Sequence, residues 1–184
     1  MARTPSTMAP LGRPMPAFTL PDTVTGGTVS SADFAGAPVL VMFICNHCPF
    51  VVHVQDAFGA LEREFADQGL RIVAISSNDV EAYPQDGPEP MKALATTLGW
   101  GFPYCLDETQ EVARAFDAAC TPDFFLYDAE HRLVYRGQLD GSRPGNDVPV
   151  TGEDLRAATR AVLAGQAPPA EQQPSLGCNI KWKR

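Results

Sequence analysis

Long apolar stretches are missing from this sequence, and none approaches the ~20 residues that a membrane-spanning helix requires. Residues 1–16 also lack a hydrophobic segment, and their prolines interrupt any helix, so they do not show the pattern of a signal peptide. From these two absences we expect a cytoplasmic protein that has no membrane partner.

Basic residues are also scarce, because 14 Lys and Arg stand against 22 Asp and Glu and leave a net charge of −8. An acidic surface is repelled by phosphate backbones, so nucleic acid is not expected as a partner. The hydrophobic fraction of 45% and the charged fraction of 20% are ordinary for a globular protein. A chain of 184 residues is long enough for one domain with a sizeable core.

Five cysteines are present, an odd number that cannot all pair within one chain. Only Cys45 and Cys48 are close in sequence, with Asn46 and His47 between them. In a reducing compartment a Cys-x-x-Cys pair indicates catalysis more than structural bridging.

The Cys-x-x-Cys pair lies between two predicted elements. Residues 39–44 are an unbroken apolar run, which is typical of a strand buried on both faces. After Cys48 and Pro49, apolar residues recur at steps of three and four as far as Phe65, which predicts a helix that Gly69 ends. The two cysteines are therefore expected where a buried strand leads into a helix N-terminus.

A helix N-terminus favours an anion, because its N–H groups are unpaired and the helix dipole is positive there. Thiols in such places can have pKa values of roughly 3.5–7.5 instead of about 8.5. Two intervening residues let Cys45 and Cys48 meet across one turn and form a reversible disulfide. A protonated His47 would favour a neighbouring thiolate further.

A zinc site is the alternative for a Cys-x-x-Cys pair, but it requires further ligands at suitable spacing. The other three cysteines are isolated in the sequence, and only His53, five residues after Cys48, could complete a Cys-Cys-His cluster. The strand-to-helix context favours the redox interpretation.

The rest of the chain alternates predicted strands and helices. Residues 17–30 predict a hairpin, residues 70–76 a strand parallel to the first, residues 91–98 an inserted helix, and residues 124–135 a second hairpin. A short strand at 102–106 and two more helices complete the pattern, with Asp107–Gln110 and Thr151–Asp154 as predicted caps. We expect a flexible lead-in at 1–16, a domain at 17–165, and a Pro/Gln-rich tether and tail at 166–184.

This order of elements resembles the thioredoxin fold, and the N-terminal hairpin and inserted helix make it similar to the peroxiredoxin-like branch. That branch includes the alkyl hydroperoxide reductase/thiol-specific antioxidant family and the TlpA/ResA-type thiol-disulfide oxidoreductases. The resemblance rests mainly on residues 43–49 and 120–123 and implies an α/β fold with a central mixed sheet flanked by helices. The tail also resembles an ending seen in uncharacterised members of the branch.

The resemblance implies a role for each motif residue. Cys45 corresponds to an exposed nucleophile, Cys48 to a buried resolving thiol, and Pro122 to a cis-proline whose loop binds substrate backbone through Thr121. The implied activity is thiol-disulfide exchange, with no cofactor beyond the Cys45–Cys48 disulfide. The implied partners are thiols or disulfides and a thioredoxin- or glutathione-type electron donor.

One difference from the related families bears on the alternative function, that of an antioxidant thiol peroxidase. Peroxidatic relatives carry Thr or Ser three residues before the reactive cysteine, a position that Cys45 takes if Cys48 is that cysteine. A metal-binding module remains a third alternative.

The remaining cysteines are less constrained. Cys105 is expected in the core, and Cys120 either packs under the site or acts as a third thiol. Cys178 could visit the site or a neighbouring chain, or its tail could pack against the body with Ile180 and Trp182.

Overall fold

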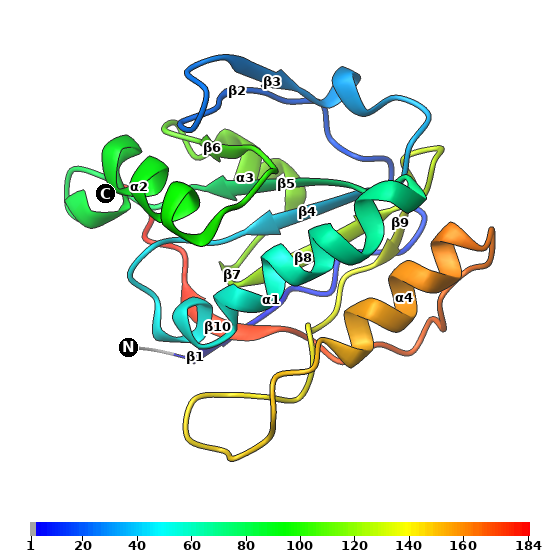
Figure 1. Cartoon of the computed structure of the whole chain (residues 1–184). Coiled ribbons are helices and arrows are strands. Elements are labelled where there is room, and N and C mark those ends of the chain that lie inside the picture. The colour runs from blue at the N-terminus through cyan, green and yellow to red at the C-terminus, as the bar shows by residue number, and fades with distance from the viewer. Residues whose placement is uncertain (1–2) are drawn as a thin grey trace.

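The computed structural model describes residues 3–184 and is built around a five-stranded mixed sheet of order β6-β5-β4-β8-β9 (Figure 1). β4 is central, because it pairs in parallel with β5 and antiparallel with β8. All five of its residues are buried, as the apolar run predicts. The strands of this sheet are β4 (Val39–Phe43), β5 (Arg71–Ser76), β6 (Tyr104–Leu106), β8 (Asp123–Tyr127) and β9 (Leu133–Tyr135).

Helices cover both faces of the sheet, because alternate strand residues point in opposite directions. Leu40 and Met42 of β4 belong to one core cluster with the inner faces of three helices, α1 (Pro49–Phe65), α2 (Pro88–Leu98) and α4 (Glu153–Leu163). Val41 of β4 packs on the other side with α3 (Glu111–Phe116) and with the hairpin of β2 (Thr19–Pro21) and β3 (Thr28–Ser30). The predicted mixed sheet, N-terminal hairpin and inserted helix are confirmed.

The lead-in and the tail form a second small sheet. β10 (Leu176–Asn179) lies between β1 (Arg3–Pro5) and β7 (Cys120–Thr121) and is antiparallel to both. Figure 1 shows β1 and β10 side by side next to the start of α1. Within the predicted lead-in, the backbone of β1 is thus paired with the tail. The tail packs against the body.

Two predicted helix caps are wrong. Gln110 is the residue that precedes α3, with a φ of 67° and no side-chain cap bond. Asp107 accepts hydrogen bonds from the N–H groups of Val112 and Ala113 instead. At α4 the N-cap is Gly152, and the N–H groups of Thr151 and Gly152 donate to the carboxylate of Asp140.

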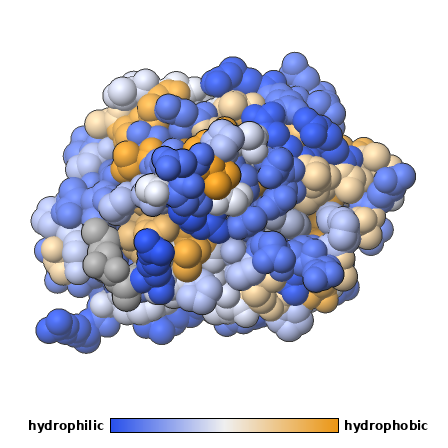
Figure 2. Space-filling view, turned by 90° about the horizontal axis from the view of Figure 1, so that it is seen from below, coloured by the Kyte–Doolittle hydropathy of each residue, from blue (hydrophilic) through white to orange (hydrophobic). Residues whose placement is uncertain are grey.

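Short 3-10 turns connect several elements: η1 (Ser31–Phe34), η2 (Ala66–Gln68) and η3 (Pro84–Asp86). η2 follows α1 and ends at Gly69, whose φ of 100° suits glycine, as predicted. No helix within residues 3–184 is long and apolar enough to cross a bilayer. On the face shown in Figure 2, hydrophobic residues form separate patches within a mainly hydrophilic surface.

Candidate active site

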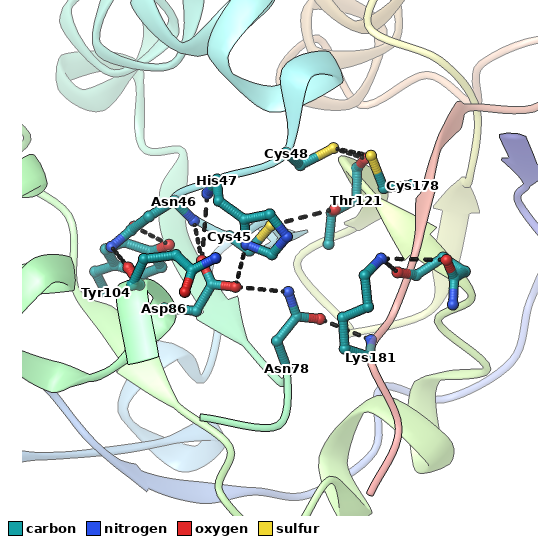
Figure 3. Close-up of polar contacts among 12 residues, drawn as sticks. Cys45, Asn46, His47, Cys48, Asn78, Asp86, Tyr104, Thr121, Cys178 and Lys181 are labelled. Carbon is teal, nitrogen blue, oxygen red and sulfur yellow. Dashed lines mark hydrogen bonds and ion pairs between the residues drawn. The ribbon is translucent and has the colours of Figure 1, made fainter. Parts of the chain in front are cut away.

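The two cysteines of the Cys-x-x-Cys pair lie where β4 leads into α1, as predicted. Cys45 follows β4 by two residues, Cys48 is the N-cap of α1, and Pro49 begins the helix. Cys45 Sγ lies 3.5 Å from Thr121 Oγ1, and Cys48 Sγ lies 3.3 Å from the Thr121 carbonyl oxygen (Figure 3). The Thr121–Pro122 peptide bond is cis, which confirms that prediction. The structure thus brings the Cys-x-x-Cys loop and the cis-proline loop together.

Cys48 has the environment of a thiolate. A hydrogen bond with Cys45 lowers the pKa of Cys48 to about 4, against the effect of burial. Further hydrogen bonds with Cys178, Thr121 and the Val51 N–H at the helix start act in the same direction. The largest of these contributions comes from the neighbouring Cys45 thiol, and the Val51 N–H at the start of α1 contributes least.

Cys45 has the opposite environment. Its hydrogen bond with Cys48, its burial and the negative charge of Asp86 all raise the pKa of the Cys45 thiol. Cys45 is 1% exposed and Cys48 is 0% exposed. The prediction of an exposed Cys45 is therefore wrong, because the loop folds the side chain inward against Thr121. The electrostatics favour Cys48, not Cys45, as the ionised sulfur.

Asp86, which is not among the predicted site residues, holds the Cys-x-x-Cys loop through hydrogen bonds. Its buried carboxylate accepts hydrogen bonds from the N–H groups of Asn46 (2.8 Å) and His47 (3.3 Å) and from Asn78 Nδ2 (3.0 Å). His47 Nδ1 lies 2.5 Å from its second oxygen. Asp86 is the last residue of η3, about 40 residues after the motif, and its sequence neighbourhood carries no signal of this contact.

Two tyrosines hold the residues between the cysteines. The ring of His47 stacks on Tyr83 with a centroid distance of 5.4 Å, and the Tyr104 hydroxyl donates to Asn46 Oδ1 at 2.9 Å. The imidazole is therefore held between Asp86 and Tyr83. Together these contacts fix the loop in one conformation.

The three cysteines outside the motif take different places. Cys105 is buried in β6 within the core, as predicted. Cys120 is buried in β7, and burial raises the pKa of its thiol. Cys178 of β10 is part of the site, because its sulfur lies 2.7 Å from Cys48 Sγ. Although a tether is predicted before it, Cys178 is held in β10.

Among the described residues, the ligating atoms of Cys45, His47 and Asp86 lie within 4.8 Å of one another. Asp86 already accepts four hydrogen bonds, so hydrogen bonding explains this grouping. His53, the third ligand of the predicted metal alternative, instead hydrogen-bonds through Nε2 to Ser142 at 2.7 Å.

Asp123 adds a pH-sensitive group next to the cis-proline. It is fully buried, its Oδ2 accepts from the Ala119 N–H at 3.1 Å, and its Oδ1 has no partner. Burial raises the pKa of Asp123 to about 7 from 3.8. A carboxyl whose pKa is raised by folding stabilises the fold below its unfolded pKa, and this contribution is lost as pH rises to the folded pKa.

We therefore expect Asp123→Asn to weaken the fall in stability between about pH 4 and pH 7, by an amount on the order of a few kcal/mol. Urea unfolding of the variant and the wild type at pH 4.5, 6 and 8 measures the difference. Asp67→Asn, at an exposed position in η2, is the matched control and should leave the slope unchanged. Parallel stability curves for wild type and Asp123→Asn would contradict the assignment.

The fold and the cysteine arrangement define a thioredoxin-like redox protein. Residues 11–136 match the AhpC/TSA family, and the chain belongs to this family. No functionally curated protein matches the chain.

Two solved structures are similar along nearly the whole chain. One is an uncharacterized conserved protein from Geobacillus kaustophilus, with 53% identity and a TM-score of 0.97 over 100% of this chain and 97% of that chain. The other is a hypothetical protein from Sinorhizobium meliloti 1021, with 50% identity and a TM-score of 0.95 over 98% of both chains.

A thiol:disulfide interchange protein of the thioredoxin family from Chlorobium tepidum TLS has a TM-score of 0.64. It is 20% identical, over 87% of this chain and 97% of that chain, and so it shows the shared fold.

Proposed function

We propose that the protein is a thiol-disulfide oxidoreductase that closes and reopens a disulfide between Cys45 and Cys48. The supporting observation is that both sulfurs contact Thr121 at the cis-proline loop, while only Cys48 is in an environment that stabilises a thiolate. Family membership supports the general redox class. The proposed partners are thiols or disulfides and a thioredoxin- or glutathione-type electron donor, and the proposed location is the cytoplasm.

The proposed reaction has two exchange steps. The Cys48 thiolate attacks one sulfur of a substrate disulfide, a mixed disulfide forms, and the other substrate sulfur leaves as a thiolate. Cys45 then loses its proton and attacks Cys48 Sγ, so that the second substrate sulfur leaves and the Cys45–Cys48 bond forms. The substrate gains two electrons, the dithiol loses two, and an external thiol donor restores the dithiol. The family resemblance implies that Cys45 attacks first, whereas the pKa directions favour the reverse order.

Access limits which substrates reach the sulfurs in this conformation. Both sulfurs are buried, and β10 lies against the cis-proline loop beside Cys48. Every substrate therefore requires a local opening. A small disulfide requires a smaller opening than a protein disulfide, for which the tail must separate from β7, so small disulfides are the proposed substrates.

Glutathione-coupled reduction of hydroxyethyl disulfide tests the proposal. The double variant Cys45→Ser/Cys48→Ser should lose turnover by on the order of a hundredfold or more, because both exchanging sulfurs are gone. Cys105→Ser, at a buried cysteine in the core, is the matched control and should stay within about twofold. Full turnover by the double variant would end the proposal.

A thiol peroxidase is the second candidate, and the ionised Cys48 at the helix N-cap favours it. In that reaction the thiolate takes one oxygen atom from a hydroperoxide and becomes a sulfenic acid, and the alcohol or water leaves. If Cys48 is the reactive cysteine, Cys45 takes the position three residues before it, where peroxidatic relatives carry Thr or Ser. Assays of the same proteins with hydrogen peroxide separate the two functions, because an oxidoreductase consumes peroxide no faster than a free thiol does.

A further inference from the structure

The tail strand β10 occupies the backbone edge of the cis-proline loop. Cys178 pairs with Thr121 and Asn179 pairs with Cys120 in the antiparallel register. This edge is where the family resemblance places substrate backbone, and here the chain's own tail takes that position. The side chain that the tail presents to Cys48 is a cysteine, with the two sulfurs 2.7 Å apart (Figure 3).

Cys178 is held at the site from both sides of the tail. Before it, the Ser175 hydroxyl donates to the Pro122 carbonyl at 2.6 Å. After it, Ile180 is buried in the core cluster on the α3 side of the sheet. The Lys181 N–H donates to Asn78 Oδ1 at 2.9 Å. The contact between the sulfurs is therefore part of the folded structure, and an exchange between them needs no movement of the tail.

Cys120, the other cysteine next to the cis-proline, is placed differently from Cys178. Neighbouring residues of a strand point to opposite faces, so the Cys120 side chain points away from the side on which Thr121 meets Cys45. Cys120 Sγ contacts the Pro122 carbonyl at 3.7 Å.

We infer that Cys178 is a third redox residue, which exchanges with the Cys45–Cys48 disulfide to form a Cys48–Cys178 disulfide. The inference rests on the proposed function. The Cys178 thiolate attacks Cys48 Sγ, the Cys48–Cys178 bond forms, and the Cys45–Cys48 bond breaks with its electron pair on Cys45. The proton released by Cys178 is taken up by Cys45, so no oxidant or reductant is consumed.

The charge environment of Cys178 changes when Cys48 is oxidised. Burial and the neighbouring Cys48 raise the pKa of Cys178 to about 12, and the positive charge of Lys181 acts in the other direction. When Cys48 is in a disulfide it carries no charge, so the contribution from a Cys48 thiolate disappears at the moment when Cys178 must ionise. Because one sulfur cannot form both bonds, Cys48 exchanges between two partners and the second disulfide ties the tail over the cis-proline loop.

Mass mapping of the oxidised full-length chain tests the inference. Cys45 and Cys48 lie in one tryptic peptide that ends at Arg63, and Cys178 lies in another that spans residues 161–181. After equilibration with oxidised and reduced glutathione, acid quenching and alkylation, a Cys48–Cys178 bond joins the two peptides and a Cys45–Cys48 bond does not. We expect the joined species in the wild type, and as the main disulfide in Cys45→Ser.

The controls separate this inference from the proposed function. Cys178→Ser should lose the joined species and keep the Cys45–Cys48 disulfide, whereas Cys120→Ser should keep both. Glutathione adducts on Cys48 of Cys45→Ser, without the joined peptides, would overturn the inference and leave the proposed function intact. A wild type that forms neither disulfide and has no turnover would overturn both.

Discussion

Cys48→Ser is expected to abolish the first exchange step, whereas Cys45→Ser is expected to retain it. The Cys48 thiolate is stabilised chiefly by the hydrogen bond with Cys45, and a serine at position 45 keeps a hydrogen-bond donor beside it. In Cys48→Ser the remaining Cys45 is buried near the charge of Asp86, so its thiol resists ionisation. The order of the two cysteines is thus open to a direct measurement.

Release of the coloured thiolate from an aromatic disulfide at pH 5.5 is the measurement. An ordinary thiol with a pKa of about 8.5 is ionised to only about 0.1% at this pH, whereas the lowered pKa of Cys48 favours its thiolate. A thiolate of low pKa is intrinsically less nucleophilic, which offsets part of the gain, so we expect Cys45→Ser to react on the order of a hundredfold faster than Cys48→Ser. The reverse result would restore Cys45 as the attacking residue.

Much of the fold could be predicted from the sequence, because hydrophobic patterns determine which faces are buried. The apolar run of β4 and the periodic residues of α1 predict both elements, and the position of the Cys-x-x-Cys motif follows from them. The cis-proline followed from the family resemblance. These features depend on short segments of the chain.

The features that escaped prediction depend on contacts between distant segments. Asp86 supports Asn46 and His47 from η3, about 40 residues away in the sequence. The sequence allowed Cys178 to visit the site without fixing its position there. Cys178 reaches Cys48 because β10 inserts between β1 and β7, and this pairing depends on backbone hydrogen bonds that carry little side-chain signal. The exposure of Cys45 was predicted wrongly for the same reason, since the residues that cover it come from elsewhere.

Gly177→Ala is the second substitution for which we expect a large effect, because Gly177 is where the tail approaches the cis-proline loop most closely. A Cβ atom there would overlap the carbonyl group of Thr121, which is backbone and cannot turn aside. The tail must move away from β7, and Cys178 next to it must move with it. We expect a loss of about 1–3 kcal/mol in the free energy of unfolding, which urea titration measures.

The same substitution tests whether the tail limits access to the active site. Alkylation of Cys48 by iodoacetamide in the folded protein should become on the order of tenfold faster, because local opening of β10 costs less free energy once its pairing is strained. Reduction of insulin should rise relative to reduction of hydroxyethyl disulfide, since a protein substrate requires a larger movement of the tail than a small molecule does. Gly141→Ala is the matched control, because a Cβ there meets no atom within 4 Å. Unchanged alkylation of Cys48 in a folded but destabilised Gly177→Ala protein would show that substrates reach the sulfur by another path, past the loop that Asp86 holds.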